Sequence, residues 1–256
     1  MKIVTTSPLP LGQDSWSRDI TVLYRGFCAL GHNAQCIRLL SKDGANFPGV
    51  MQVEEYDLHS STFWQSQGCD LVVVNSWGNP RYNHVISAIK ESGSAVFVRL
   101  DSDGYNSPWN GFRHYLATSF HIFRERSSIL VSAAKALSKT IVYSIPTVYD
   151  QRMLEHLALA DAIGIESNGA YALFSKLLQS YDRDDLVKKL YLFRHPVVPE
   201  IDTMDVPGYE GRDDCIVAVG RWDSQQKDAP LLIKTLAIGL ASNPTWRADI
   251  YGTGDA

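Results

Sequence analysis

Residues 71–100 read LVVVNSWGNPRYNHVISAIKESGSAVFVRL, and this stretch decides the fold class. Two runs, 71–75 and 95–100, are almost continuously apolar rather than alternating, which is typical of parallel strands covered on both faces. Between them, residues 82–92 have a helical spacing of apolar side chains and end at Gly93, a common helix terminator. A strand, a helix and a second strand in this order predict a parallel β-α-β unit.

The same alternation of strands and helices continues along the chain. Further apolar runs predict strands at 3–5, 140–144, 162–165, 216–219 and 247–251. Helices are expected at 15–30, 167–178 and 229–241, with Ser167 as the N-cap of the second. We therefore predict an α/β protein with a Rossmann-like, doubly wound parallel sheet.

Residues 199–212, PEIDTMDVPGYEGR, interrupt this rhythm because they are rich in acidic residues, Pro and Gly and have no apolar period. They predict a linker between two domains. We expect an N-terminal domain at 1–200, a linker at 201–213 and the start of a second Rossmann-like domain at 214–256. That last part is too short for a complete domain, so the second domain is expected to be incomplete here.

Composition bounds the class of protein. The 256 residues are 45% hydrophobic and 20% charged, with a net charge of −4, as in a globular protein that does not bind nucleic acid. No apolar run is long enough to cross a bilayer or to serve as a signal peptide, which predicts a cytoplasmic protein. The four cysteines are scattered and form no CxxC pair, so no metal site is expected.

One segment departs from this charge balance. Residues 112–143 contain five Lys or Arg and one acid, Glu125, with aromatic and aliphatic residues between them. One interpretation is a patch that contacts anionic lipid or an acidic acceptor, which would make the protein membrane-associated. The alternative is the solvated face of an ordinary core helix.

A pair of cations follows the strand at 216–219. The stretch 217–232, VAVGRWDSQQKDAPLL, places Arg221 directly after Gly220 and Lys227 six residues later, just before a helix. Ligands of open α/β sheets bind beyond the carboxyl ends of strands, and a helix N-terminus attracts anions. The two cations and the helix predict a diphosphate site, with the guanidinium gripping two oxygens and the ammonium adding a point charge. The alternative is a surface loop in which Arg221 pairs with Asp223.

The residues VGRWDSQQKDAPLLIKTLA, followed by ADIYGTGDA, resemble the donor-binding half of GT-B glycosyltransferases of the retaining family 4 group. The family pattern is a strand, Gly-Arg, a loop, Lys, a helix and later a Gly-x-Gly turn. The matching residues here are Gly220, Arg221, Lys227, Gly252 and Gly254. Three further stretches are similar to the N-terminal half of the family: residues 1–39, ALADAIGIESNGAYALF at 158–174 and LYLFRHPVVPEID at 190–202. The resemblance therefore spans nearly the whole chain.

The resemblance implies a GT-B-like fold and a glycosyltransferase that moves a sugar from a nucleoside-diphosphate sugar to a carbohydrate, lipid-linked or other small acceptor. It also implies retention at the anomeric carbon, no metal and no cofactor beyond the nucleotide-sugar substrate. Two alternatives stay open: a nucleotide-sugar epimerase of the same fold, and a non-catalytic module that binds a nucleotide or sugar.

The N-terminal half supplies the candidates for the acceptor side. The strand AVFVRLDSDG carries Arg99 or Asp101 where the family has a histidine, so Asp101 is the candidate catalytic residue and Arg99 a cleft residue. Asp101 and Asp103 also form a DxD pattern, which is read as a turn, as an acceptor contact or as a metal ligand pair. Gly12, after the first strand, and His195, at the predicted hinge, complete the candidate cleft.

Overall fold

The computed structural model describes residues 1–12, 16, 19–41, 43–76, 82–100, 120, 128–144, 146–196, 208, 210, 212–221 and 229–253. The chain divides into two compact units, Met1–Asp202 (unit 1) and Thr203–Ala256 (unit 2). Among the described residues, no helix has the length and apolar character needed to cross a membrane.

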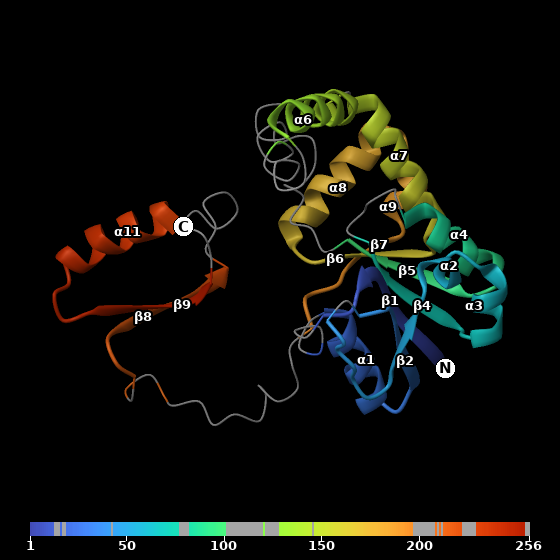
Figure 1. The fold of residues 1–256 in the computed structure, drawn as a ribbon, viewed down its shortest axis with the longest axis horizontal. Helices are drawn as coiled ribbons and strands as arrows, with labels where there is room; N and C mark the ends of the chain where they lie inside the picture. Colours follow the sequence, from blue (N-terminus) through green and yellow to red (C-terminus); the bar gives the residue numbers. More distant parts are fainter. Residues whose placement is uncertain are drawn as a thin grey trace. The chain divides into compact units, whose positions relative to one another are not determined.

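Unit 1 is built on a parallel sheet of seven strands in the order β3-β2-β1-β4-β5-β6-β7 (Figure 1). The strands are β1 (Lys2–Pro10), β2 (Asn33–Leu39), β3 (Val50–Val53), β4 (Leu71–Asn75), β5 (Ala95–Arg99), β6 (Ala162–Ile165) and β7 (Leu190–Leu192). The chain runs outward from β1 to β3 and then returns to β4 beside β1, so the strand order reverses between these two strands. This reversal is the switch point at which open α/β sheets bind ligands.

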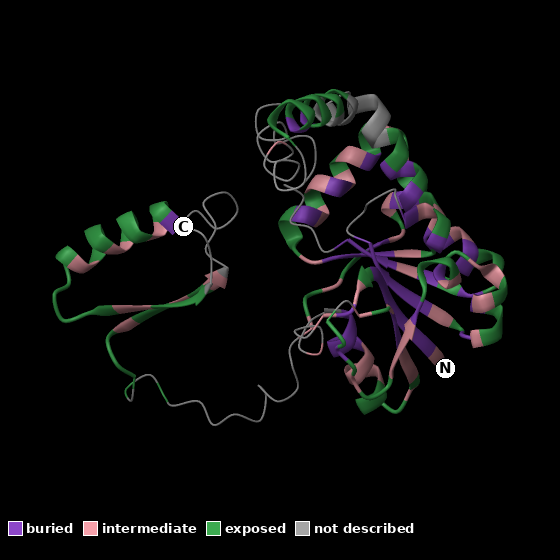
Figure 2. Ribbon diagram, viewed as in Figure 1, coloured by how far each residue is buried: buried purple, intermediate pink, exposed green. Residues whose placement is uncertain are grey.

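Helices cover both faces of the unit 1 sheet (Figure 1). The described helices of unit 1 are α1 (Asp19–Ala29), α2 (Glu55–Leu58), α3 (Ser61–Gln67), α4 (Asn83–Glu91), α6 (Ile129–Ser144), α7 (Pro146–Leu159), α8 (Asn168–Ser180) and α9 (Asp184–Val187), and α6 lies away from the sheet. The face under α1 holds a small core cluster that includes Ile3 and Ile20, and the other face holds the main core with Trp64 and Ile86. The strands of this sheet are the most deeply buried part of the unit (Figure 2).

Unit 2 has two parallel strands and one helix among its described residues: β8 (Cys215–Arg221), α11 (Ala229–Ala241) and β9 (Arg247–Thr253). This strand, helix and parallel strand are the β-α-β unit that the sequence predicted. The parallel sheets of both units agree with the predicted α/β, Rossmann-like class.

The predicted strand at 140–144 is wrong, because these residues form the C-terminal turn of α6. The run TIVYS has the β-branched composition of a strand, but it follows directly on the helix formers of SAAKALSK. A short apolar run cannot be assigned to strand or helix by its periodicity alone, and here the preceding helix continues through it.

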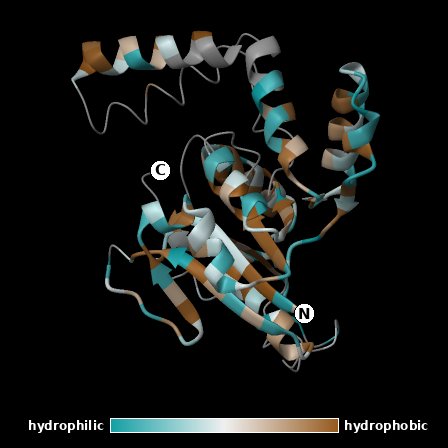
Figure 3. Ribbon diagram, turned by 90° about the vertical axis from the view of Figure 1, so that its right-hand side faces the viewer, coloured by the Kyte–Doolittle hydropathy of each residue, from teal (hydrophilic) through white to brown (hydrophobic). Residues whose placement is uncertain are grey.

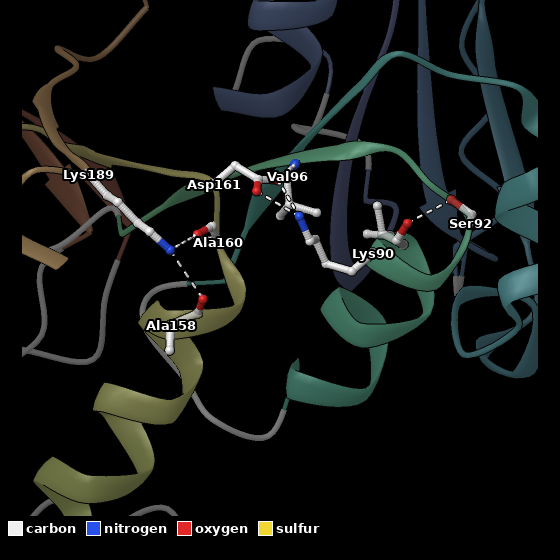
Figure 4. Close-up of polar contacts among 8 residues, drawn as sticks. Lys90, Ser92, Val96, Ala158, Ala160, Asp161 and Lys189 are labelled. Carbon is white, nitrogen blue, oxygen red and sulfur yellow. Dashed lines mark hydrogen bonds and ion pairs between the residues drawn. The ribbon is translucent and has the colours of Figure 1, made fainter. Parts of the chain in front are cut away.

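The amino-terminal edge of the unit 1 sheet is held by charged side chains (Figure 4). Lys90, in the last turn of α4, donates to both carboxylate oxygens of Asp161 at 2.6 and 2.8 Å, and one of these oxygens also accepts from the Val96 backbone N–H. Burial alone would raise the pKa of Asp161, but the hydrogen bonds from Lys90 and Val96 outweigh it and the pKa is lowered. Lys189 Nζ donates to the Ala160 carbonyl at 2.7 Å. The contacts of Asp161 join α4 and β5 to the start of β6, and the contacts of Lys189 join the start of β7 to the end of α7.

Candidate functional site

The carboxyl ends of β4, β5, β6 and β7 lie at one edge of the sheet, because all of these strands are parallel. The register pairs Arg99 with Asn75 on one side and with Gly164 on the other. Glu166 follows β6 directly and His195 comes three residues after β7. The carboxyl edge therefore gathers polar side chains from strands that are far apart in the sequence.

Three of these side chains form one charged cluster, which we call the edge cluster: Arg99, Glu166 and His195. Arg99 Nη2 binds Glu166 Oε1 and also contacts His195 Nδ1 at 2.7 Å. His195 Nε2 lies 2.7 Å from Glu166 Oε2. The Arg99 side chain is fully buried and that of Glu166 is 12% exposed, whereas that of His195 is 57% exposed. The cluster thus runs from the core to the surface of the edge.

The hydrogen-bond pattern assigns the protons in the edge cluster. An arginine side chain only donates, so His195 Nδ1 must accept from Arg99. The remaining proton of a neutral imidazole is then on Nε2, which donates to Glu166. Glu166 accepts from both partners as an ionised carboxylate.

The packing below the edge cluster depends on Gly164. A Cβ atom at this position would lie 2.6 Å from Phe97 Cζ and 3.0 Å from Phe193 Cβ. The rings of Phe97 and Phe193 meet edge to face with their centroids 5.1 Å apart. Because Gly164 has no side chain, the rings of Phe97 and Phe193 can pack against β6 beside the edge cluster.

A second polar network lies at the carboxyl end of β4. Ser76 Oγ is 2.8 Å from His156 Nε2, and His156 Nδ1 is 2.6 Å from Asn83 Oδ1. Since the amide oxygen only accepts, Nδ1 carries the proton and Nε2 accepts from the serine hydroxyl. Burial lowers the pKa of His156 to about 4, so the ring is neutral. Ser76 is fully buried, so this network joins α7 and α4 to β4 and does not present a nucleophile.

The carboxyl end of β1 is positioned by a buried arginine of the neighbouring strand. Arg38 donates to the carbonyls of Leu9 and Pro10 at 3.4 and 3.3 Å, and Leu11 N–H donates to the Leu39 carbonyl at 3.1 Å. Gly12, the candidate from the sequence, follows these residues at the carboxyl end of β1. It shares the carboxyl edge of the sheet with the edge cluster.

In unit 2, two of the five predicted donor residues lie side by side. Gly220 in β8 is paired with Gly252 in β9, and Gly252 has φ of 137°, which favours glycine. Arg221 is the last residue of β8. The other predicted site residues lie outside the described part of the chain: Asp101, Asp103, Lys227, Gly254 and the side chain of Arg221. Their predicted roles stay predictions.

The structure thus brings together two of the residues predicted from sequence, Arg99 and His195, and adds Glu166, which sequence reasoning missed. The signal for Glu166 was present, because an acidic residue stands between a buried strand and the N-cap Ser167, whose hydroxyl accepts from Ala170 N–H at 3.1 Å. Among the described residues, no group of three His, Cys, Asp or Glu side chains is placed to hold a metal ion.

Comparisons with known proteins agree on the fold. No protein-family model matches the sequence, and no curated protein matches it significantly. The structure is similar to that of the apo form of the lipopolysaccharide outer core galactosyltransferase WaaB, with a TM-score of 0.52 and 15% identity. That similarity covers 100% of this chain and 62% of the galactosyltransferase, so this chain spans less than two thirds of its length.

A second solved structure is less similar. It is from Methylobacillus flagellatus, and its own assignment as an NAD-dependent epimerase/dehydratase is provisional. It has a TM-score of 0.34 and 14% identity over 81% of this chain and 84% of that one, which is too weak to carry an argument. The parallel sheets, the switch point and the similarity to WaaB lead to one conclusion: this chain has a Rossmann-like α/β fold that is similar to the fold of the galactosyltransferase WaaB.

Proposed function

We propose that this protein is a glycosyltransferase that moves a sugar from a nucleoside-diphosphate sugar to an acceptor hydroxyl, with retention and without a metal ion. The observation that carries the proposal is the edge cluster of Arg99, Glu166 and His195 in a GT-B-type fold. Buried ion pairs contribute little net stability, so an ion pair with a bound histidine at the carboxyl edge of a sheet points to a role in binding or catalysis.

In this proposal, unit 1 binds the acceptor. Glu166 would accept a hydrogen bond from an acceptor hydroxyl, and the partly exposed His195 would line the acceptor site. Arg99 would keep the Glu166 carboxylate ionised and correctly oriented. Gly12, Asp101 and Asp103 are further proposed acceptor-side residues, with Asp101 as the candidate catalytic residue.

Unit 2 would bind the donor. Arg221 ends β8 and Ala229 begins α11, so the proposed diphosphate site lies at a strand end that leads into a helix N-terminus. Arg221 and Lys227 would bind the diphosphate beside Gly220, Gly252 and Gly254. Negative charge grows on the diphosphate as the bond to the sugar breaks, so these cations would stabilise the transition state more than the bound donor.

Calorimetric titration with UDP, GDP and ADP tests the donor site. We expect one of them to bind and Arg221→Ala to weaken that binding by about 1.5–3 kcal/mol, the scale of hydrogen bonds to charged groups. Lys234→Ala removes an exposed cation from α11 and is the matched control that should leave the affinity unchanged. Equal affinities in all three proteins would remove the proposed donor site.

Product analysis tests the reaction itself. A glycosyltransferase releases a nucleoside diphosphate and places the sugar on an acceptor, whereas an epimerase returns an altered nucleotide sugar and a binding module releases nothing. We expect Glu166→Gln to lower turnover without changing donor affinity, and we expect turnover to persist in a chelator. Donor that stays intact with every class of acceptor would argue against the enzyme.

A further inference from the structure

Helix α6 exposes large apolar side chains that ordinary packing would bury. Ile129 is 62% exposed and Leu130 83%, while Val131, Leu137 and Ile141 are between 45% and 48% exposed. The exposed character of α6 is visible in Figure 2, and Figure 3 shows hydrophobic positions along the same helix at the top of the view. The apolar surface of α6 therefore needs a partner other than solvent.

The exposed apolar residues follow the periodicity of one helix face. Leu130, Ala134, Leu137 and Ile141 are spaced i, i+4, i+7 and i+11, so they form one stripe along α6. Ser132 and Ala136 are fully buried and mark the side of α6 that faces the protein. The helix thus turns small side chains inward and its large apolar stripe outward, which is the reverse of a core-packed helix.

The charges around the stripe indicate what covers it. Helix α6 contains two lysines, Lys135 and Lys139, and no acidic residue. All of α6 except its last residue belongs to the segment 112–143, which has a net charge of +4, whereas the whole chain has a net charge of −4. A negatively charged surface is therefore attracted by this segment and repelled by the rest of the chain.

We propose that α6 docks on a membrane surface rich in anionic lipid, with the Leu130–Leu137–Ile141 stripe at the boundary between headgroups and acyl chains. Lys135, which is exposed, would reach the lipid phosphates beside the stripe. This combination of an apolar face and flanking lysines without acidic residues is the arrangement by which interfacial helices bind anionic bilayers. The proposal does not depend on the sugar-transfer reaction.

Vesicle co-sedimentation tests the proposal. The protein should bind vesicles of phosphatidylcholine with about 30% phosphatidylglycerol, bind pure phosphatidylcholine much more weakly, and lose affinity as salt is raised. The double variant Leu130→Asp/Leu137→Asp should bind at least about 10-fold more weakly, because it places charge in the apolar stripe. Leu30→Asp, at a 75% exposed position after α1, is the matched control and should bind like the wild type.

A charge reversal gives an independent test. Lys135→Glu should weaken binding to the anionic vesicles, whereas Lys176→Glu, the same change on the exposed side of α8, should not. The proposal is overturned if the wild type fails to bind anionic vesicles at low salt, or if the double variant binds as well as the wild type. It is also overturned if Leu130→Asp lowers the thermal midpoint or converts a dimer to a monomer, because the stripe would then be covered by protein.

Discussion

Arg99 Nη2 donates a hydrogen bond to His195 Nδ1 over 2.7 Å, although 96 residues separate the two in the sequence. The contact exists because β5 and the segment after β7 end at the same edge of a parallel sheet, with β6 between them. It joins a fully buried cation to a partly exposed imidazole, and Glu166 binds both. The contribution of these three side chains to the free energy of unfolding can be measured separately from any activity.

Removing the buried cation should destabilise unit 1 strongly. Arg99→Met leaves the 12% exposed Glu166 carboxylate without its guanidinium partner, and breaking a buried pair in this way costs about 3–5 kcal/mol. The double variant Arg99→Met/Glu166→Leu should lose less than the sum of the two single variants, because no charge is left unpaired. Urea unfolding of the four proteins measures the difference.

The matched control for this cycle is a pair nearer the surface. The side chains of Lys90 and Asp161 are 39% and 46% exposed, so solvent screens their attraction and Lys90→Met should cost about 1 kcal/mol or less. A loss in Arg99→Met no larger than the loss in Lys90→Met would show that the edge cluster is not a buried charge pair.

The buried His156 should make stability depend on pH between its two pKa values. Burial lowers the pKa of His156 from 6.5 to about 4, so between these values the unfolded chain binds a proton that the folded protein does not. Stability should therefore fall as the pH drops from 6.5 to about 4, by up to about 3 kcal/mol, and this loss should not increase below that range.

Chemical denaturation from pH 7.5 to 4 measures this loss, and His156→Gln supplies the comparison because glutamine does not titrate. Other acidic groups change the stability of both proteins alike, so the difference between the two curves isolates the histidine. Parallel curves for the wild type and His156→Gln would mean that His156 has the same pKa in the folded and the unfolded protein, so that burial does not lower it.

An added methyl group at Gly164 should disturb the packing beside the edge cluster. Gly164→Ala places a Cβ 2.6 Å from Phe97 Cζ, and overpacking of this kind costs about 1–3 kcal/mol. Combining it with Phe97→Leu should recover part of the loss, since the smaller side chain vacates the ring position. Thermal and urea unfolding of the single and double variants measure both effects.

Gly169→Ala is the control for this substitution. The new Cβ would approach only Ser167 Oγ, at 4.0 Å, and the position lies in α8, where alanine is favoured over glycine by about 1 kcal/mol. It should leave stability unchanged or raise it. A Gly164→Ala variant as stable as Gly169→Ala would show that the Phe97 ring moves aside at no cost.

Much of the fold could be predicted from local sequence patterns. The apolar runs at β4 and β6 have the bounds that were predicted, and α11 begins and ends as expected. Ser167 caps α8 as its position before a helical pattern indicated. These features depend on interactions within a few residues of the chain. Local pattern was wrong at 140–144, where TIVYS continues a helix although its composition favours a strand.

The candidate site could also be predicted from the sequence only in part. The sequence alone determined that polar residues follow buried strands, because Arg99, Glu166 and His195 can each be found beside an apolar run. Local sequence does not show that these three side chains meet, because their contact depends on the order and register of β5, β6 and β7 in the folded sheet. Hydrophobic periodicity sets the conformation of each segment. The pairing of strands depends instead on contacts between segments that are distant in sequence, and several strands have similar local patterns.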